Sequence, residues 1–197
     1  MPDNNSFVDL MRRVRAGDAA AADELWRQFE PFLRRDVRLR LRDPHLRRLL
    51  DEGDVCQSVM ASFFVRAAAG QFDLDGPEQL QQLLARMGRN KLAGQARRHR
   101  AERRDYRREE PLPDRDDHAA AGSGPSPSIA VAMSELLQEF RGRLDPEERQ
   151  LADLRASGRS WAEIAAVLGG SPDSRRVQLN RAIARVSGEL GLDVDEE

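Results

Sequence analysis

Apolar residues recur at steps of three and four through most of this chain, and this spacing constrains the fold more than any other feature of the sequence. It is the spacing of one face of an α-helix, which has about 3.6 residues per turn. Between residues 22 and 41 the repeat is continuous, whereas the alternating β-branched runs typical of strands are scarce. Since Ala, Leu, Arg and Glu are abundant and favour helices, we predict an all-α protein.

One segment interrupts the helical pattern. Residues 111–128 are rich in proline, glycine and serine and cannot build a core, so we expect a flexible linker there. The linker separates a predicted N-terminal domain, residues 1–110, from a predicted C-terminal domain, residues 129–197. The length of 197 residues suits two small helical domains.

The C-terminal part carries signals for two short helices joined by a turn. Ser160 and Glu163 have the spacing of a capping box at the start of one helix. Gly169 and Gly170 then form a turn, and a last helix is expected from about Pro172 to Leu190. This is the pattern of a helix-turn-helix, whose second helix lies in the major groove of DNA.

The last helix is predicted to be amphipathic, with Leu179, Ala182, Ile183 and Val186 facing inward. Arg, Gln and Asn are the side chains that contact base edges, and they gather on its other face. An ordinary solvated face is the alternative explanation. The candidate DNA-contacting residues are Ser174, Val177, Gln178, Arg181 and Arg185, with Arg176 and Asn180 at the edges.

Positive charge is concentrated in one segment, although the net charge of the whole chain is only −2. Ten basic residues fall between Arg86 and Arg108, opposed there only by Glu102 and Asp105. Such density repels itself unless a polyanion neutralises it, so phosphate contact is its natural use. A solvated charged helix is the alternative. Within this run we single out Arg89, Lys91, Arg97, Arg98 and Arg100.

A third candidate surface is acidic. Asp51 is a predicted N-cap, and the exposed face of the helix that follows carries Asp51, Asp54, Gln57 and Ser58. Between two basic surfaces, an acidic face suits a protein partner better than DNA. Helix capping with ordinary solvation would explain the same residues.

Several classes of function are disfavoured. Cys56 is the only cysteine, so an intrachain disulfide and a cysteine zinc cluster are excluded. The three histidines are scattered, and no catalytic constellation or glycine-rich phosphate loop is present. No apolar run approaches a membrane span, and no signal peptide is evident. We expect a cytoplasmic protein that is not an enzyme and has no cofactor, metal or membrane partner.

Taken together, the motifs resemble those of extracytoplasmic-function sigma factors. Residues 51–57 (DEGDVCQ), then Phe63-Phe64, Phe72, residues 84–90 (LARMGRN) and Arg97-Arg98 resemble the core-binding and promoter-melting domain of that family. The helix-turn-helix around Gly169 is similar to the family's C-terminal domain. The resemblance covers nearly the whole chain apart from the linker.

The resemblance implies a role for each surface. Asp51, Asp54 and Gln57 match positions that bind the clamp helices of the polymerase β′ subunit, and β is a further contact. Asn90 matches an asparagine near the pocket for a flipped base of the −10 element, and Phe72 an aromatic in the loop framing that pocket. The last helix would meet the −35 element. Core polymerase, promoter DNA and an anti-sigma factor are the partners that the resemblance allows.

The chain departs from the family pattern at one residue of the acidic face and in the turn before the last helix. The acidic residue that usually follows the glutamine is Ser58 here. The turn that usually contains Gly-Thr-Val is Asp173-Ser174-Arg175, which places Arg175 on the apolar face, where its stem is expected to extend outward. The alternatives left open are a stand-alone helix-turn-helix regulator and an RNA-binding protein that uses the basic helix.

Overall fold

The computed structural model describes residues 4–41, 50–106 and 129–192, and every element within them is an α-helix. The prediction of an all-α protein is therefore confirmed. The predicted linker, residues 111–128, lies outside the described residues. The helices are α1 (Asn4–Arg15), α2 (Ala19–Arg40), α4 (Glu52–Ala68), α5 (Pro77–Tyr106), α6 (Ile129–Arg143), α7 (Pro146–Ala156), α8 (Trp161–Leu168) and α9 (Pro172–Glu189).

Side-chain caps fix where these helices begin. Asp18 accepts hydrogen bonds from the backbone N–H groups of Ala20 and Ala21 at the start of α2. Capping boxes begin α7 at Asp145 and α8 at Ser160, the second being the predicted one. Each cap satisfies backbone donors that the first helical turn leaves unpaired, which contributes about 1 kcal/mol of stability.

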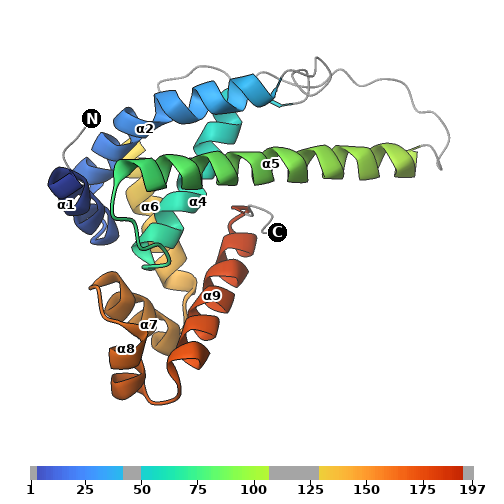
Figure 1. Cartoon of the computed structure of the whole chain (residues 1–197). Helices are drawn as coiled ribbons and strands as arrows, with labels where there is room; N and C mark the ends of the chain where they lie inside the picture. The colour runs from blue at the N-terminus through green and yellow to red at the C-terminus, as the bar shows by residue number, and fades with distance from the viewer. Residues whose placement is uncertain (1–3, 42–49, 107–128, 193–197) are drawn as a thin grey trace.

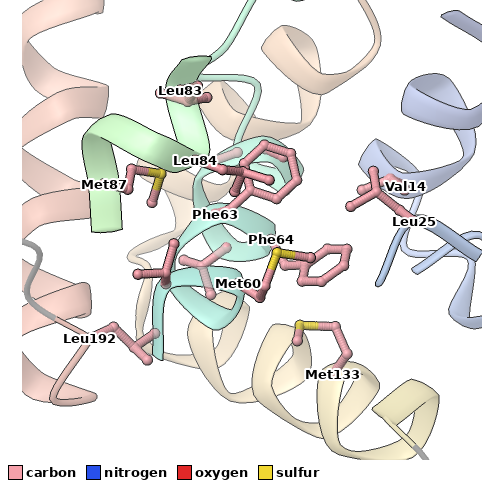
Figure 2. Packing of buried hydrophobic residues seen from close by; sticks show 14 of the residues in the cluster. Val14, Leu25, Met60, Phe63, Phe64, Leu83, Leu84, Met87, Met133 and Leu192 are labelled. Carbon is pink, nitrogen blue, oxygen red and sulfur yellow. The ribbon is translucent and has the colours of Figure 1, made fainter. Parts of the chain in front are cut away.

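Helix α4 lies at the centre of the N-terminal half, in contact with α1, α2, α5 and α6 (Figure 1). This helix is buried nearly all round, from Val55 to Ala67. Phe63 and Phe64 pack edge-to-face with ring centroids 5.6 Å apart and are fully buried among side chains of neighbouring helices (Figure 2). Truncating either ring to alanine should cost about 3–5 kcal/mol.

Helix α6 bridges the two halves of the chain. It contacts α2 and α4, and it also touches α9. Its buried face is formed by Met133, Leu137 and Phe140, whereas Val131 is 50% exposed. Because α6 belongs to the predicted C-terminal domain yet packs on N-terminal helices, the boundary between the domains stays a prediction.

Helices α7, α8 and α9 pack against one another as a three-helix unit (Figure 1). Leu151, Ile164, Leu179 and Ile183 fill its centre and are at most 1% exposed. The predicted inward face of the last helix is thus buried. On α8, Ala165 is buried and Ala166 is exposed.

The unit meets the N-terminal half at the loop between α4 and α5. Gly70 there has φ of +72°, and a Cβ on it would lie 2.7 Å from Cγ of Arg155 on α7. The Arg155 guanidinium lies 2.5 Å from Oδ2 of Asp73 and 5.0 Å from the centre of the Trp161 ring. Only glycine fits at position 70, because both its backbone conformation and its neighbours exclude a side chain.

Candidate functional site

The acidic face predicted on α4 lies at the start of that helix. Asp51 caps it, accepting hydrogen bonds from the backbone N–H groups of Gly53 at 2.6 Å and Asp54 at 3.2 Å. Asp54 and Gln57 are exposed, one helical turn apart, whereas Ser58 is half-buried. The structure therefore places Asp54 and Gln57 together on the surface, with Asp51 beside them in a capping role.

Glu52 is acidic too, but it is occupied within the fold. Both of its carboxylate oxygens accept hydrogen bonds from Arg38 of α2, at 2.9 and 2.5 Å. These hydrogen bonds, followed by the charges of Arg38 and Arg34, lower the pKa of Glu52. The pair attaches the start of α4 to α2. Asp54 forms no ion pair with another residue that the structure describes, so it is the carboxylate on this face proposed for a partner.

The lone cysteine lies directly behind this face. Cys56 is 1% exposed, and burial raises the pKa of its thiol to about 11. A thiol of this kind stays protonated and is a poor nucleophile. It packs as an apolar side chain and gives the site no chemistry of its own.

The loop after α4 forms one wall of a groove along α5. Phe72 is half-buried and stacks on Phe63, with ring centroids 5.8 Å apart and planes 4° from parallel. Its carbonyl oxygen accepts a hydrogen bond of 2.8 Å from Arg15. The groove has a volume of about 640 Å³, and residues 71–74 face Gln79, Gln82, Leu83, Ala85, Arg86 and Arg89 across it.

The basic residues of α5 differ in their exposure. Arg89, Arg97 and Arg98 are exposed and Asn90 is half-buried. The side chain of Arg100 lies outside the described residues. Lys91, which the sequence grouped with the phosphate-contacting residues, is only 6% exposed. That expectation is corrected for Lys91, because a side chain packed into the helical core does not reach a phosphate.

The outward face of α9 carries most of the residues predicted for it. Glu148 and the α9 residues Asp173, Ser174, Val177, Gln178 and Arg181 line a shallow depression of about 570 Å³. Gln178 is half-buried rather than fully exposed. The fully exposed members of the predicted set are Ser174, Arg176, Val177, Asn180, Arg181 and Arg185.

Several of these arginines form ion pairs. Arg176 lies 3.2 Å from Asp173, and Arg185 contacts Glu148 at 2.6 Å and Glu189 at 3.1 Å. Hydrogen bonding to Glu189 and the charge of Glu148 raise the pKa of Arg185. Arg181 forms no ion pair with another residue that the structure describes, so it is the most available cation on this face.

The sequence placed Arg175 on the apolar face with its stem extending outward, but it did not predict the hydrogen bonds that Arg175 makes within the protein. Its side chain is 13% exposed, and its guanidinium turns toward the end of α8 instead of toward solvent. It donates to the carbonyl oxygens of Leu168 at 2.6 Å and Gly169 at 2.8 Å, and it also contacts Glu147 and Gln178. The only sequence signal for this contact was a charged residue at an apolar position.

The described residues contain no cluster of three or more His, Cys, Asp or Glu side chains placed to hold a metal ion. Among the same residues, no helix has both the length and the apolar character required to cross a bilayer.

One comparison with known protein families finds a match. The family model of the ECF sigma factors matches residues 4–190, nearly the whole chain, and the protein belongs to that family. It is thus a sigma factor, a DNA-binding and polymerase-binding protein of transcription initiation. No curated protein and no solved structure matches it.

Proposed function

We propose that this sigma factor binds core RNA polymerase through the face of α4 that carries Asp54 and Gln57. The single observation that carries the proposal is that these residues lie exposed together while neighbouring Glu52 is held by Arg38. A charge that the fold does not use for its own stability is available for a partner. The clamp helices of β′ are the expected partner, and the cytoplasm is the expected place of action.

We further propose that the groove between the Phe72 loop and α5 receives a flipped base of the −10 element. Flipping a base costs a few kcal/mol, which capture in a pocket offsets. The groove offers the half-buried Phe72 ring at one side and the exposed Arg86 and Arg89 at the other. Asn90 follows on the same helix, and Arg97 and Arg98 continue the positive surface toward the DNA backbone.

The outward face of α9 is proposed to contact the −35 element, with α8 and α9 acting as a helix-turn-helix. Exposed Arg181 and Asn180 supply the hydrogen-bond donors and acceptors that base edges require. Polymerase then performs the chemistry, and this chain supplies position and sequence selection.

The test is the double variant Asp54→Arg with Gln57→Ala. A reversed charge against a complementary partner costs several kcal/mol, so affinity for core polymerase should fall by about a hundredfold or more. Because both residues are exposed, thermal unfolding should be unchanged. Binding is measured with purified core enzyme and the full chain.

A matched control exists on α6. Glu135 and Gln138 are exposed at the same spacing of three residues, so Glu135→Arg with Gln138→Ala makes the same chemical change elsewhere. The control should bind polymerase normally. A folded Asp54→Arg, Gln57→Ala variant with normal polymerase binding would refute the proposal, and promoter binding by the wild-type chain without polymerase would favour a stand-alone regulator.

A further inference from the structure

Arg175 joins three helices of the C-terminal unit through one guanidinium. Nε and Nη2 donate to the carbonyl oxygens of Gly169 and Leu168 at the end of α8, at 2.8 and 2.6 Å. Nη1 donates to Oε1 of Glu147 at 2.6 Å, on α7. Helix ends leave carbonyls unpaired and favour a positive charge, so Arg175 closes α8 in place of a backbone cap.

The same Nη1 donates a fourth hydrogen bond, of 2.7 Å, to Oε1 of Gln178. Four of the five guanidinium N–H donors therefore have acceptors inside the protein. With its side chain 13% exposed, Arg175 is not placed to contact DNA itself. It contacts instead a residue that lines the depression on the outward face of α9.

We infer that Arg175 is a positioning residue for −35 recognition, acting through the side-chain amide of Gln178. The inference rests on the proposed function of α9. Arginine has donors and no acceptor, so the amide atom that faces it must be the oxygen. The amide nitrogen of Gln178 is then the end left for DNA, and it is a donor.

This orientation has a consequence for sequence preference. A donor suits the acceptors that guanine, adenine and thymine present in the major groove, and it does not suit the amino group of cytosine. At the base that faces Gln178, the wild-type protein should therefore discriminate against cytosine. Without Arg175 the amide is free to turn its oxygen outward, and that discrimination should be lost.

The test compares Arg175→Val, Gln178→Ala and the double variant with wild type. Valine is chosen because position 175 lies on the apolar face of the helix and its side chain is only 13% exposed, so the variant is expected to fold. Arg149→Val is the matched control, since Arg149 also donates to helix-end carbonyls, those of Arg141 and Leu144, but does not contact Gln178. Thermal unfolding of each full chain checks the fold.

The measurement is holoenzyme binding to a promoter library randomised over the −35 region. Arg175→Val should reduce discrimination against cytosine at one position by about three- to tenfold, the value of a hydrogen bond. It should have no further effect at that position in the Gln178→Ala background. Arg149→Val should leave the preference unchanged.

Two results would overturn the inference. One is an Arg175→Val variant that keeps the wild-type discrimination against cytosine. The other is a loss of preference that is not specific to Gln178, because Arg175→Val weakens it equally at all −35 positions or by the same amount in the Gln178→Ala background. A wild-type chain that fails to join polymerase overturns the proposed function instead. The same library is then bound by the full chain alone, where the same two results decide the role of Arg175.

Discussion

The arginines on α5 and those on α9 are held very differently. On α5, Arg86, Arg89 and Arg98 are exposed and form no ion pair with another described residue. On α9, Arg175, Arg176 and Arg185 each contact a carboxylate of the same chain. Phosphate contacts position a protein on DNA, whereas base contacts discriminate sequence. A row of arginines unpaired among the described residues, as on α5, suits phosphate contact, whereas on α9 the ion pairs within the chain leave Arg181 as the arginine available to a base edge.

Arg181 gives the largest expected effect in this comparison. It is exposed on α9 beside Gln178 and unpaired among the described residues, so it is available to a base edge. Arg181→Ala should cost roughly 1–3 kcal/mol at the preferred −35 sequence and flatten the preference there. Holoenzyme binding to matched and scrambled −35 sequences measures this, and a loss equal on both would place Arg181 on phosphate.

Asn90 tests whether α5 also recognises a base. It is half-buried and directly follows Arg89, which lines the groove together with Phe72. Asn90→Ala should weaken promoter opening by about 1 kcal/mol, the value of one hydrogen bond, and leave closed-complex binding intact. Permanganate footprinting measures opening. A pre-melted bubble should not restore preference at that base, and normal opening by the variant would contradict the assignment.

Arg98 should show the smaller, non-specific effect of a phosphate contact. Arg98→Ala removes one cation from an exposed basic segment, so every promoter should bind more weakly by a similar factor. The slope of log affinity against log salt should fall by about one unit. Titrations at several salt concentrations measure it, and a change in sequence preference would reverse the roles of the two surfaces.

The smallest effect is expected for Arg185. It was predicted to contact DNA, but Glu148 and Glu189 hold its guanidinium. Exposed ion pairs contribute about 0.2–1 kcal/mol to stability. Arg185→Ala should therefore lower the unfolding temperature slightly and change −35 preference less than Arg181→Ala does. If both variants weaken −35 binding equally, Arg185 leaves its carboxylates on binding DNA.

Helix positions followed from the sequence because their signals are local. Asp51 and Ser160 cap their helices as predicted, and Asp18 caps α2 in the same way. The surroundings of α4 could not be predicted in the same way. It is buried nearly all round because α1, α2, α5 and α6 contact it from several sides. The apolar periodicity of one helix does not show which distant helices will pack against it.

The candidate site shows the same division. Asp54 and Arg181 are exposed, as the helical repeat predicted, and Arg98, which was singled out by charge density alone, is exposed too. Lys91 and Gln178 were predicted wrongly in part, since one is buried and the other half-buried. Charged and polar side chains are expected outside unless a partner receives them. For Gln178 that partner is Arg175, three residues earlier on α9, and the contacts with α7 and α8 that fix the Arg175 guanidinium exist only in the folded unit.

Because Cys56 is buried, the reactivity of its thiol can be used to measure local unfolding around α4. With a pKa of about 11, roughly one thiol in ten thousand is ionised at pH 7, and 1% exposure shields the sulfur further. A thiol reagent should therefore modify the protein only during excursions that open the packing around α4. The labelling rate then measures the free energy of that opening at a single position, one residue before Gln57.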